Sequence, residues 1–247
     1  MVEVRLRTRV IFLRGVLSSA LLTCCAVAAL GATAGAGVVT PSSVISTAES
    51  AIAQQASVHV VFVARAGSPA KTETIVADVG RASGTETATE GTASLVIRLS
   101  TTHVYVSGNS SGLTTIFGMS AADAKKVGKD WESWKAGTSQ YADLKSDLTM
   151  SSVRALFPKA KGTTLTTVVS NGSTFSVLKW KIAATSSIPG VTNTLTVSSG
   201  ATTLPVMEVA RISNGAKATT TLSGWGEPLV VGVPPAAATI PSSKIAG

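Results

Sequence analysis

The second half of the chain alternates apolar with polar residues over long stretches, and two Asn-Gly pairs interrupt the alternation, Asn171-Gly172 and Asn214-Gly215. Asn-Gly favours the two-residue type I′ turn, which needs positive φ at both central residues and matches the twist of antiparallel strands. The flanking runs are rich in Thr, Val, Ile and Leu, as half-buried strands are. The pattern therefore predicts an antiparallel meander over about 163–223.

A helical pattern and several short alternating runs precede this meander. Val44, Ala48 and Ile52 recur every four residues and predict a short helix. Ser42 or Ser43 is expected to cap this helix, since Ser is a preferred N-cap residue. The alternating runs that follow predict strands over 57–64, 72–80, 93–100 and 103–107.

Residues 112–157 lose the alternation and form an insert between the two β-rich halves. Helical patterns occupy 112–117 and 120–127, and Ser120 is expected to cap the second of them. A polar helix or loop leads on to Met150, and one or two helical turns complete the insert. Because a sheet needs cover on one face, we predict an α+β fold, mostly antiparallel β, in which a curved half-open β-barrel wraps over the N-terminal helix and the helical insert.

Residues 1–36 have the composition of an export segment. Several arginines near the N-terminus precede the uncharged apolar run 15–30 and then small residues with an Ala-x-Ala pattern. This order predicts a cleaved signal peptide. Two alternatives stay open: an uncleaved membrane anchor, for which 15–39 is long enough, and lipid attachment at Cys24, although Thr23 stands where a lipobox usually has Gly or Ala. All three place the protein outside the cytoplasm, secreted or attached to a bacterial envelope.

The rest of the chain divides into one domain, over 41–231, and a C-terminal segment, 232–247. The domain contains no sequence repeat, and no strong linker divides it. The C-terminal segment is rich in Pro and Ala, and we expect it to be an extended tail.

Composition excludes several classes of function. Both cysteines, Cys24 and Cys25, lie in the export segment, so the domain has no thiol for a disulfide, for catalysis or for a zinc site. The net charge is +8, but part of it comes from the N-terminal arginines and the rest is scattered. Nucleic-acid binders concentrate basic residues and interleave aromatic ones for stacking, whereas here the basic residues are scattered and only 4% of residues are aromatic.

Enzymatic signatures are also missing from the sequence. His59 and His103 each fall on the polar side of an expected strand, without clustered carboxylates. Ser120 stands in a sequence that lacks the last Gly of a nucleophile elbow, and its role as a helix cap explains it better. We therefore expect no catalytic residue, no metal ion and no cofactor.

Four local sequences, in their order along the chain, suggest a relationship to a known family. They are the helix that leads into 57–64, the segment 102–106 (Thr-His-Val-Tyr-Val), 129–131 (Lys-Asp-Trp) after the helical insert, and the ending 222–228 (Leu-Ser-Gly-Trp-Gly-Glu-Pro). With these features, residues 41–235 resemble the mycobacterial LppX/LprG-type envelope lipoproteins and, more distantly, the LolA-like lipoprotein carriers. The sequence departs from that family at its N-terminus, where a full lipobox is expected.

The resemblance implies an apolar cavity that takes lipid chains inside the half-barrel. The residues expected to face it are medium-sized and mostly aliphatic: Val60, Phe62, Ile75, Leu95, Ile97, Val104, Val106, Phe117, Leu178, Trp180, Ile182 and Leu195. The alternative is that these side chains interdigitate with the helices in an ordinary filled core, since protein interiors are normally close-packed.

Trp131 and Trp134 stand three residues apart in the insert. They are expected either to gate the cavity mouth, with 112–150 as the moving segment, or to anchor the insert on the sheet. The function that follows is an exported, non-catalytic, monomeric protein that binds a lipid, glycolipid or other hydrophobic ligand and meets a membrane or envelope surface. The alternative is an envelope structural or interaction domain with a filled core and no ligand.

Overall fold

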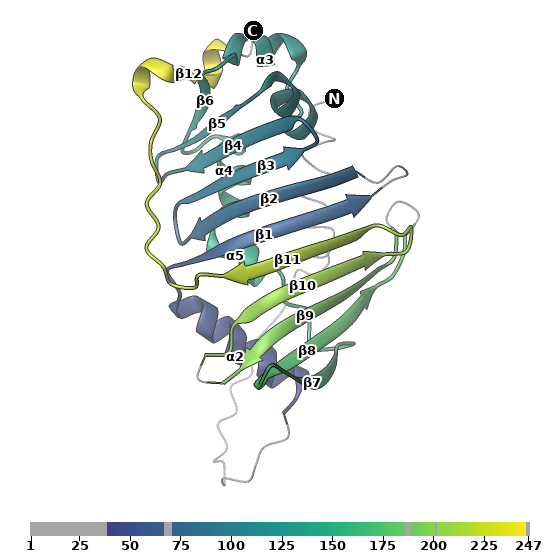
Figure 1. Ribbon diagram of the computed structural model, residues 1–247. Helices are drawn as coiled ribbons and strands as arrows, with labels where there is room; N and C mark the ends of the chain where they lie inside the picture. Colours follow the sequence, from purple (N-terminus) through teal and green to yellow (C-terminus); the bar gives the residue numbers. More distant parts are fainter. Residues whose placement is uncertain (1–38, 67–70, 186–188, 201, 246–247) are drawn as a thin grey trace.

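The computed structural model describes residues 39–66, 71–185, 189–200 and 202–245. Within these residues, twelve strands form one open, curved sheet in the order β12-β6-β5-β4-β3-β2-β1-β11-β10-β9-β8-β7. The meander β1 to β6 meets the meander β7 to β11 where β1 pairs antiparallel with β11. Figure 1 shows the twisted sheet with the helices on one side of it. The predicted class, a mostly antiparallel α+β half-barrel, is confirmed.

The strands are β1 (Ser57–Ala66), β2 (Lys71–Gly80), β3 (Gly84–Glu90), β4 (Ala93–Leu99), β5 (His103–Gly108), β6 (Trp131–Lys135), β7 (Thr164–Ser170), β8 (Ser173–Ile182), β9 (Val191–Ser199), β10 (Pro205–Ile212), β11 (Lys217–Ser223) and β12 (Thr239–Pro241). The helical elements are α2 (Pro41–Gln54), the π-helical η1 (Gly112–Ile116), α3 (Ala121–Val127), α4 (Ser139–Asp147), α5 (Met150–Arg154), and the 3-10 helices η2 (Ala236–Ala238) and η3 (Ser242–Lys244).

Helix α2 forms where the apolar stripe predicts it, but its cap differs from the prediction. The N-cap is Thr40, whose Oγ1 accepts a hydrogen bond from the Ser43 amide at 3.2 Å. The Ser43 Oγ in turn accepts from the Thr40 amide at 3.0 Å, which completes a capping box. Pro41 occupies the first turn, where its missing N–H costs nothing. The assignment of the cap to Ser42 or Ser43 was therefore wrong, because the helix begins before Ser42.

The two Asn-Gly pairs both close hairpins, but with different turns. Asn171 and Gly172 have φ of 49° and 74°, which confirms the predicted type I′ turn between β7 and β8. In the second pair Gly215 alone has a positive φ, of 90°. The Ile212 amide donates to the Ala216 carbonyl at 2.9 Å, so the loop has three residues and ends in a left-handed glycine. The type I′ prediction was wrong there, although the hairpin itself is present.

Strands β3 and β6 were not predicted, and both lack a clean alternation. In β3 the inward positions hold Gly84, Glu86 and Ala88, which are small or acidic. Strand β6 was placed in the helical insert, but it pairs antiparallel with β5. Its tryptophans stand three residues apart, a spacing that shares a face in a helix and separates faces in a strand.

The C-terminal segment, expected as an extended tail, returns along the sheet and adds to its edge (Figure 1). Strand β12 pairs parallel with β6, and η3 follows it. Arg98 Nη1 donates to the Gly232 carbonyl at 3.1 Å, and Lys126 Nζ donates to the Ile245 carbonyl at 2.5 Å. Since Ile245 is only 3% exposed, this segment contributes to the packed structure.

The helices cover the concave face of the sheet in two groups. In Figure 1, α2 lies behind the β11 to β7 half, α4 and α5 lie behind the other half, and α3 lies at its β6 end. The π-helical η1 contacts β3, β4 and β5. One contiguous apolar core joins both groups to the inward side chains of the sheet. Among the described residues, no helix is both long and apolar enough to cross a membrane. The predictions for 1–36, including lipid attachment at Cys24, lie outside the described residues.

Candidate ligand cavity

A cavity of about 120 Å³ lies between the concave face of the sheet and helices α4 and α5. It is near the middle of the strand order, at the junction of the two meanders, with walls from β1, β2, β10 and β11. The predicted ligand-binding residues that line it are Val60, Phe62, Ile75, Ile97 and Phe117.

The sheet wall of the cavity follows from strand register. Val60 of β1 lies opposite Ala77 of β2 on one side and Leu222 of β11 on the other. Phe62 likewise lies opposite Ile75 and Thr220. Opposite residues share a face of the sheet, so these strands present a continuous and mostly apolar surface. The small side chain of Ala77 leaves room in the middle of that surface.

The helical wall comes from two short helices with firm attachments at their ends. The Thr138 side chain caps α4 by accepting from the Tyr141 amide at 3.3 Å. The Tyr141 hydroxyl reaches two carbonyls in the β4–β5 turn, at 3.1 and 3.0 Å. At the α4–α5 junction the backbone passes so close to Gly84 that a Cβ there would lie 2.4 Å from the Leu148 carbonyl oxygen. The apolar side chains of this segment that line the cavity are Leu144, Leu148, Val153 and Leu156.

The π-helical turn η1 places Phe117 at one end of the cavity. The Phe117 amide donates to the Gly112 carbonyl at 3.0 Å, the longer loop that defines a π turn. Gly112 lies directly on β4, where an added Cβ would come within 1.9 Å of the Ser94 carbonyl oxygen. The Phe117 ring packs against Trp134 with ring centroids 5.6 Å apart. Trp134 thus supports the Phe117 ring, and Phe117 lines the cavity.

Most of the polar residues in the lining are acidic, and the sequence analysis did not predict them. The cavity is lined by Glu73, Glu86, Asp147 and Glu208, and no Lys, Arg or His is among its described lining residues. Glu208 is 8% exposed, and its burial raises the pKa of its carboxyl to about 7. A hydrogen bond from Thr220 opposes that pKa shift. The sequence does place carboxylates in expected strands, but which of them face inward toward the same cavity follows only from the register between strands.

The other predicted cavity residues lie elsewhere in the core. Leu95, Val104 and Val106 are fully buried in the half that η1 covers. Leu178, Trp180 and Leu195 are buried in the half that α2 covers, and Ile182 is half-buried there. None of these seven is among the residues that line the cavity. These seven residues therefore belong to the apolar core on either side of the cavity.

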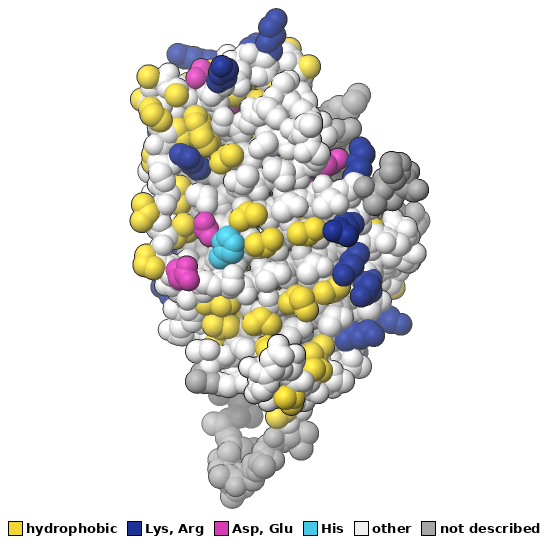
Figure 2. All heavy atoms as spheres, in the orientation of Figure 1, with side chains coloured by type: hydrophobic (Ala, Val, Ile, Leu, Met, Phe, Trp, Pro, Cys, Tyr) yellow, Lys and Arg dark blue, Asp and Glu magenta, His cyan; other side chains and the backbone are white. Residues whose placement is uncertain are grey.

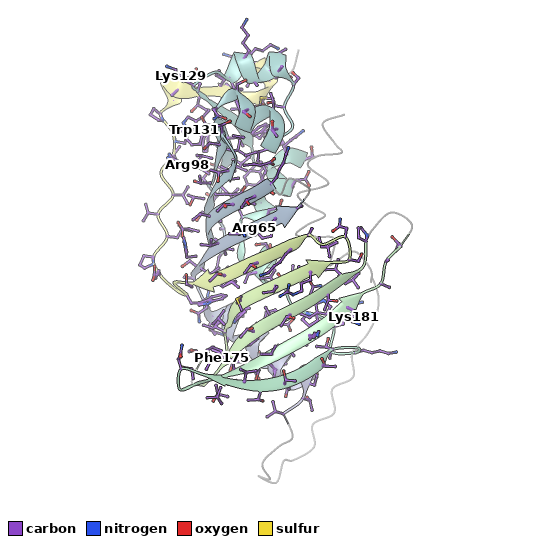
Figure 3. The ribbon with its side chains drawn as sticks, turned by 45° about the vertical axis from the view of Figure 1, so that its right-hand side comes forward. Arg65, Arg98, Lys129, Trp131, Phe175 and Lys181 are labelled. Carbon is purple, nitrogen blue, oxygen red and sulfur yellow. The ribbon has the colours of Figure 1, made fainter. Side chains whose placement is uncertain are left out.

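The tryptophans predicted as a gate are parts of strand β6, on opposite faces of the sheet. Trp134 points inward against Phe117, and the Arg98 guanidinium lies over the Trp131 ring at 4.6 Å from its centroid (labelled in Figure 3). Neither side chain is among the described residues that line the cavity. The segment that does cover the cavity is the part of the insert around α4 and α5.

The candidate chemistry of the histidines and of Ser120 has structural explanations. His59 Nδ1 lies 2.7 Å from Asp78 Oδ1 in the next strand, and His103 stacks on Tyr105. Ser120 caps α3, as predicted, by accepting from the Asp123 amide at 3.0 Å. In the part of the chain that the structure describes, no three His, Cys, Asp or Glu residues are grouped as a metal site would need.

Four cations form a row on the face of the sheet that points away from the helices. Lys217 lies directly opposite both Arg65 and Arg211, and Arg211 and Lys181 both lie opposite Thr192 of β9. Figure 2 shows Lys and Arg side chains gathered at this end of the strands, and Figure 3 labels Arg65 and Lys181 there. We call Arg65, Lys181, Arg211 and Lys217 the basic row. Because like charges directly opposite each other are destabilising, the row costs stability unless a counter-charge covers it.

No protein-family model and no curated protein matches this sequence. Among solved structures, LprF from Mycobacterium bovis is similar with a TM-score of 0.51 and 14% identity, over 78% of this chain and 96% of that chain. The lipoprotein LppX from Mycobacterium tuberculosis gives a TM-score of 0.44 and 14% identity, over 78% and 98% of the two chains. At this identity the similarity to LprF concerns the fold alone. It confirms, at the level of the fold, the resemblance to mycobacterial LppX/LprG-type lipoproteins that the sequence suggested.

Proposed function

We propose that this protein binds an apolar ligand in the cavity between the concave face of the sheet and helices α4 and α5, without catalysing a reaction. The observation that carries the proposal is a cavity with mostly apolar walls in contact with the apolar core. Burial of acyl chain there contributes about 0.8 kcal/mol per CH₂. The fold shared with LprF and the export segment predicted at 1–36 support a carrier of lipid in a bacterial envelope.

The size of the cavity limits how a ligand enters. Its volume of about 120 Å³ is near that of an engineered apolar cavity of about 150 Å³ that binds benzene. Drug-sized ligands need pockets of roughly 300–1,000 Å³. A complete acyl chain therefore requires the cover to move away from the sheet. We propose that the insert supplies this movement, through α4 and α5.

The gate proposal follows from the attachments of these two helices. Helices α4 and α5 have nine and five residues, so neither is stable without tertiary contacts. The Tyr141 hydroxyl holds the start of α4 and the close contact at Gly84 holds the α4–α5 junction, while mostly apolar side chains of the two helices line the cavity. An acyl chain can replace those apolar contacts with equivalent ones, so opening costs little once a ligand is present.

We propose that the basic row docks the protein on an anionic membrane surface. Each Lys or Arg near such a surface contributes about 1 kcal/mol, and the negative lipid also relieves the repulsion within the row. The row lies on the face opposite the helices, so docking leaves the cavity cover free to move.

Vesicle sedimentation tests the membrane proposal. Lys217→Ser with Arg211→Ser should weaken binding to phosphatidylglycerol vesicles by about 2 kcal/mol, and wild-type binding should fall as salt rises. The matched control is Lys125→Ser with Lys129→Ser, which removes the same charge outside the row. Equal losses in the two double variants would show that net charge alone, and not this surface, attracts the protein.

We propose that the functional domain includes the C-terminal segment. Residues 41–231 form the half-barrel, and 232–245 close its β6 edge.

Native mass spectrometry of the gently purified protein tests the ligand proposal. We expect a population heavier than the polypeptide by the mass of a lipid, and uptake of the apolar fluorophore N-phenyl-1-naphthylamine after delipidation. A protein that carries no lipid and takes up no fluorophore is instead the interaction domain with a filled core.

A further inference from the structure

Three polar side chains cross the concave face of the sheet on adjacent strands. Thr220 of β11 lies directly opposite Glu208 of β10, and Glu208 lies opposite Leu195 of β9. Asn193 stands two residues before Leu195, so it shares that face and is the diagonal neighbour of Glu208. Diagonal neighbours in an antiparallel pair are about 7–8 Å apart. We call Asn193, Glu208 and Thr220 the polar track.

The polar track begins at the cavity and ends in the core. Glu208 and Thr220 line the cavity, whereas Asn193 has no exposed surface. The residues directly opposite Asn193 are Trp180 and Ala210. The polar track therefore extends the polar surface at Glu208 by one diagonal step from the cavity to the buried Asn193 amide.

Asn193 lacks hydrogen-bond partners that its burial demands. Neither its Oδ1 nor its Nδ2 has a partner among the described residues. Buried polar side chains are normally hydrogen-bonded, and leaving one unsatisfied is costly. Its neighbours on the same face of β9 are Leu195 and Val197, so a leucine would suit the position without this cost. An unsatisfied amide that is kept beside a ligand cavity points to a partner that arrives with the ligand.

The chemistry of the polar track selects the kind of partner. The Asn193 amide must both accept and donate, and the Glu208 carboxyl, whose pKa burial raises to about 7, accepts when ionised and can also donate when protonated. A hydroxyl group can donate to one and accept from the other. A phosphate monoester is anionic, and the cavity that it would enter is lined by the acidic residues Glu73, Glu86 and Asp147. An ammonium group donates only, and would leave the Asn193 Nδ2 unsatisfied.

We propose that Asn193, Glu208 and Thr220 form a subsite for an uncharged, hydroxyl-bearing group of an amphiphile whose hydrocarbon chain occupies the cavity. This inference rests on the proposed function. In the complex, ligand hydroxyls donate to the Glu208 carboxylate and to Asn193 Oδ1, and the Asn193 Nδ2 donates to a ligand oxygen. The subsite thus discriminates between ligands of equal chain length by their polar groups.

The test compares three probes with the same acyl chain: 1-monolauroylglycerol, methyl laurate and lauroyl lysophosphatidic acid. Competition against N-phenyl-1-naphthylamine measures the Kd of each. The wild-type protein should bind monolauroylglycerol at least tenfold more tightly than either of the other two. Asn193→Leu, of similar size, should bring the Kd of monolauroylglycerol within about threefold of that of methyl laurate. Thr194→Val, next to Asn193 but on the other face of β9, is the matched control and should keep the wild-type preference.

Thermal unfolding distinguishes the subsite from a purely structural role of Asn193, because the two predict opposite changes in the melting temperature of Asn193→Leu. Asn193→Leu should raise the melting temperature of the delipidated protein, because it removes an unsatisfied amide. A lower melting temperature with an unchanged preference for monolauroylglycerol overturns the subsite, as does tighter binding of the phosphate probe by the wild-type protein. If methyl laurate also fails to bind, the proposed function fails with it. Binding of methyl laurate without any preference for the hydroxylated probe refutes the subsite alone.

Discussion

Replacement of Glu208 by Gln should remove a large part of the pH dependence of folding stability. Glu208 is 8% exposed, and burial raises the pKa of its carboxyl from 4.5 to about 7 in the folded protein. The folded state therefore binds this proton more tightly than the unfolded state does. The resulting stabilisation is fully present below pH 4.5 and is lost as the pH rises through 7.

The size of the effect follows from the two pKa values. A pKa difference of one unit corresponds to about 1.36 kcal/mol, so the Glu208 contribution falls by roughly 2–3 kcal/mol between pH 5 and pH 8. The assay is urea unfolding of the wild-type protein and of Glu208→Gln at both pH values. The free energy of unfolding of the wild type should fall by that much more than that of the variant.

Two further variants locate the effect. Burial, together with nearby Asp123, raises the pKa of Glu132 to about 7 as well, so Glu132→Gln should remove a separate contribution of the same sign. Thr220→Val removes the hydrogen bond that lowers the Glu208 pKa, and should shift the loss of stability to higher pH. Identical pH dependence in the wild type and in Glu208→Gln would refute the burial argument.

Three other predictions concern packing and are checked by thermal unfolding. Gly112→Ala puts a Cβ 1.9 Å from the Ser94 carbonyl oxygen and should lower the free energy of unfolding by about 3 kcal/mol or more. The control, Gly172→Ala, meets open space and should lower it only by the roughly 1–2 kcal/mol that the left-handed backbone costs. Equal losses would contradict the close contact of η1 with β4. A chain that ends at Val231 should melt at a lower temperature, because Arg98 loses the Gly232 carbonyl and β6 loses β12; an unchanged melting temperature would mean that 232–247 is a dispensable tail. Tyr141→Phe should lower the free energy of unfolding by about 0.5–1.5 kcal/mol and speed the uptake of N-phenyl-1-naphthylamine in stopped flow, because the hydroxyl holds α4 to the sheet. Lower stability without faster uptake would show that α4 is not part of the gate.

Local pattern was sufficient for much of the sheet. Strands β1 and β2 alternate over much of their length, and the β7–β8 hairpin carries its turn signal, Asn171-Gly172, in the sequence, so the meanders could be predicted. Strand β3 could not, because Gly84 and Glu86 are inward for reasons that lie across space: the α4–α5 junction crosses Gly84, and Glu86 lines the cavity. In β6, the neighbouring strand β5 decides the conformation of Trp131 and Trp134.

The residues of the candidate site could be predicted from the sequence only in part, for the same reason. The sequence indicates which residues face inward but not how far the helices fill the concavity, so Ile97 and Leu178 looked equivalent. Helix packing separates them, since Ile97 lines the cavity and Leu178 lies in the filled half. The acidic lining and the polar track depend on register between strands that are distant in sequence, which single-strand patterns do not contain.

The central claim is that the core is open at the cavity and filled elsewhere, and tryptophan substitution at Ile97 and at Leu178 tests it most directly. The measurement is the affinity of the delipidated variants for N-phenyl-1-naphthylamine, with urea unfolding of the same samples. Ile97→Trp should fill the cavity and weaken uptake at least tenfold with little loss of stability. Leu178→Trp should overpack a filled region, cost about 1–3 kcal/mol and leave uptake unchanged. Equal destabilisation by both substitutions, with uptake unaffected by either, would contradict the account.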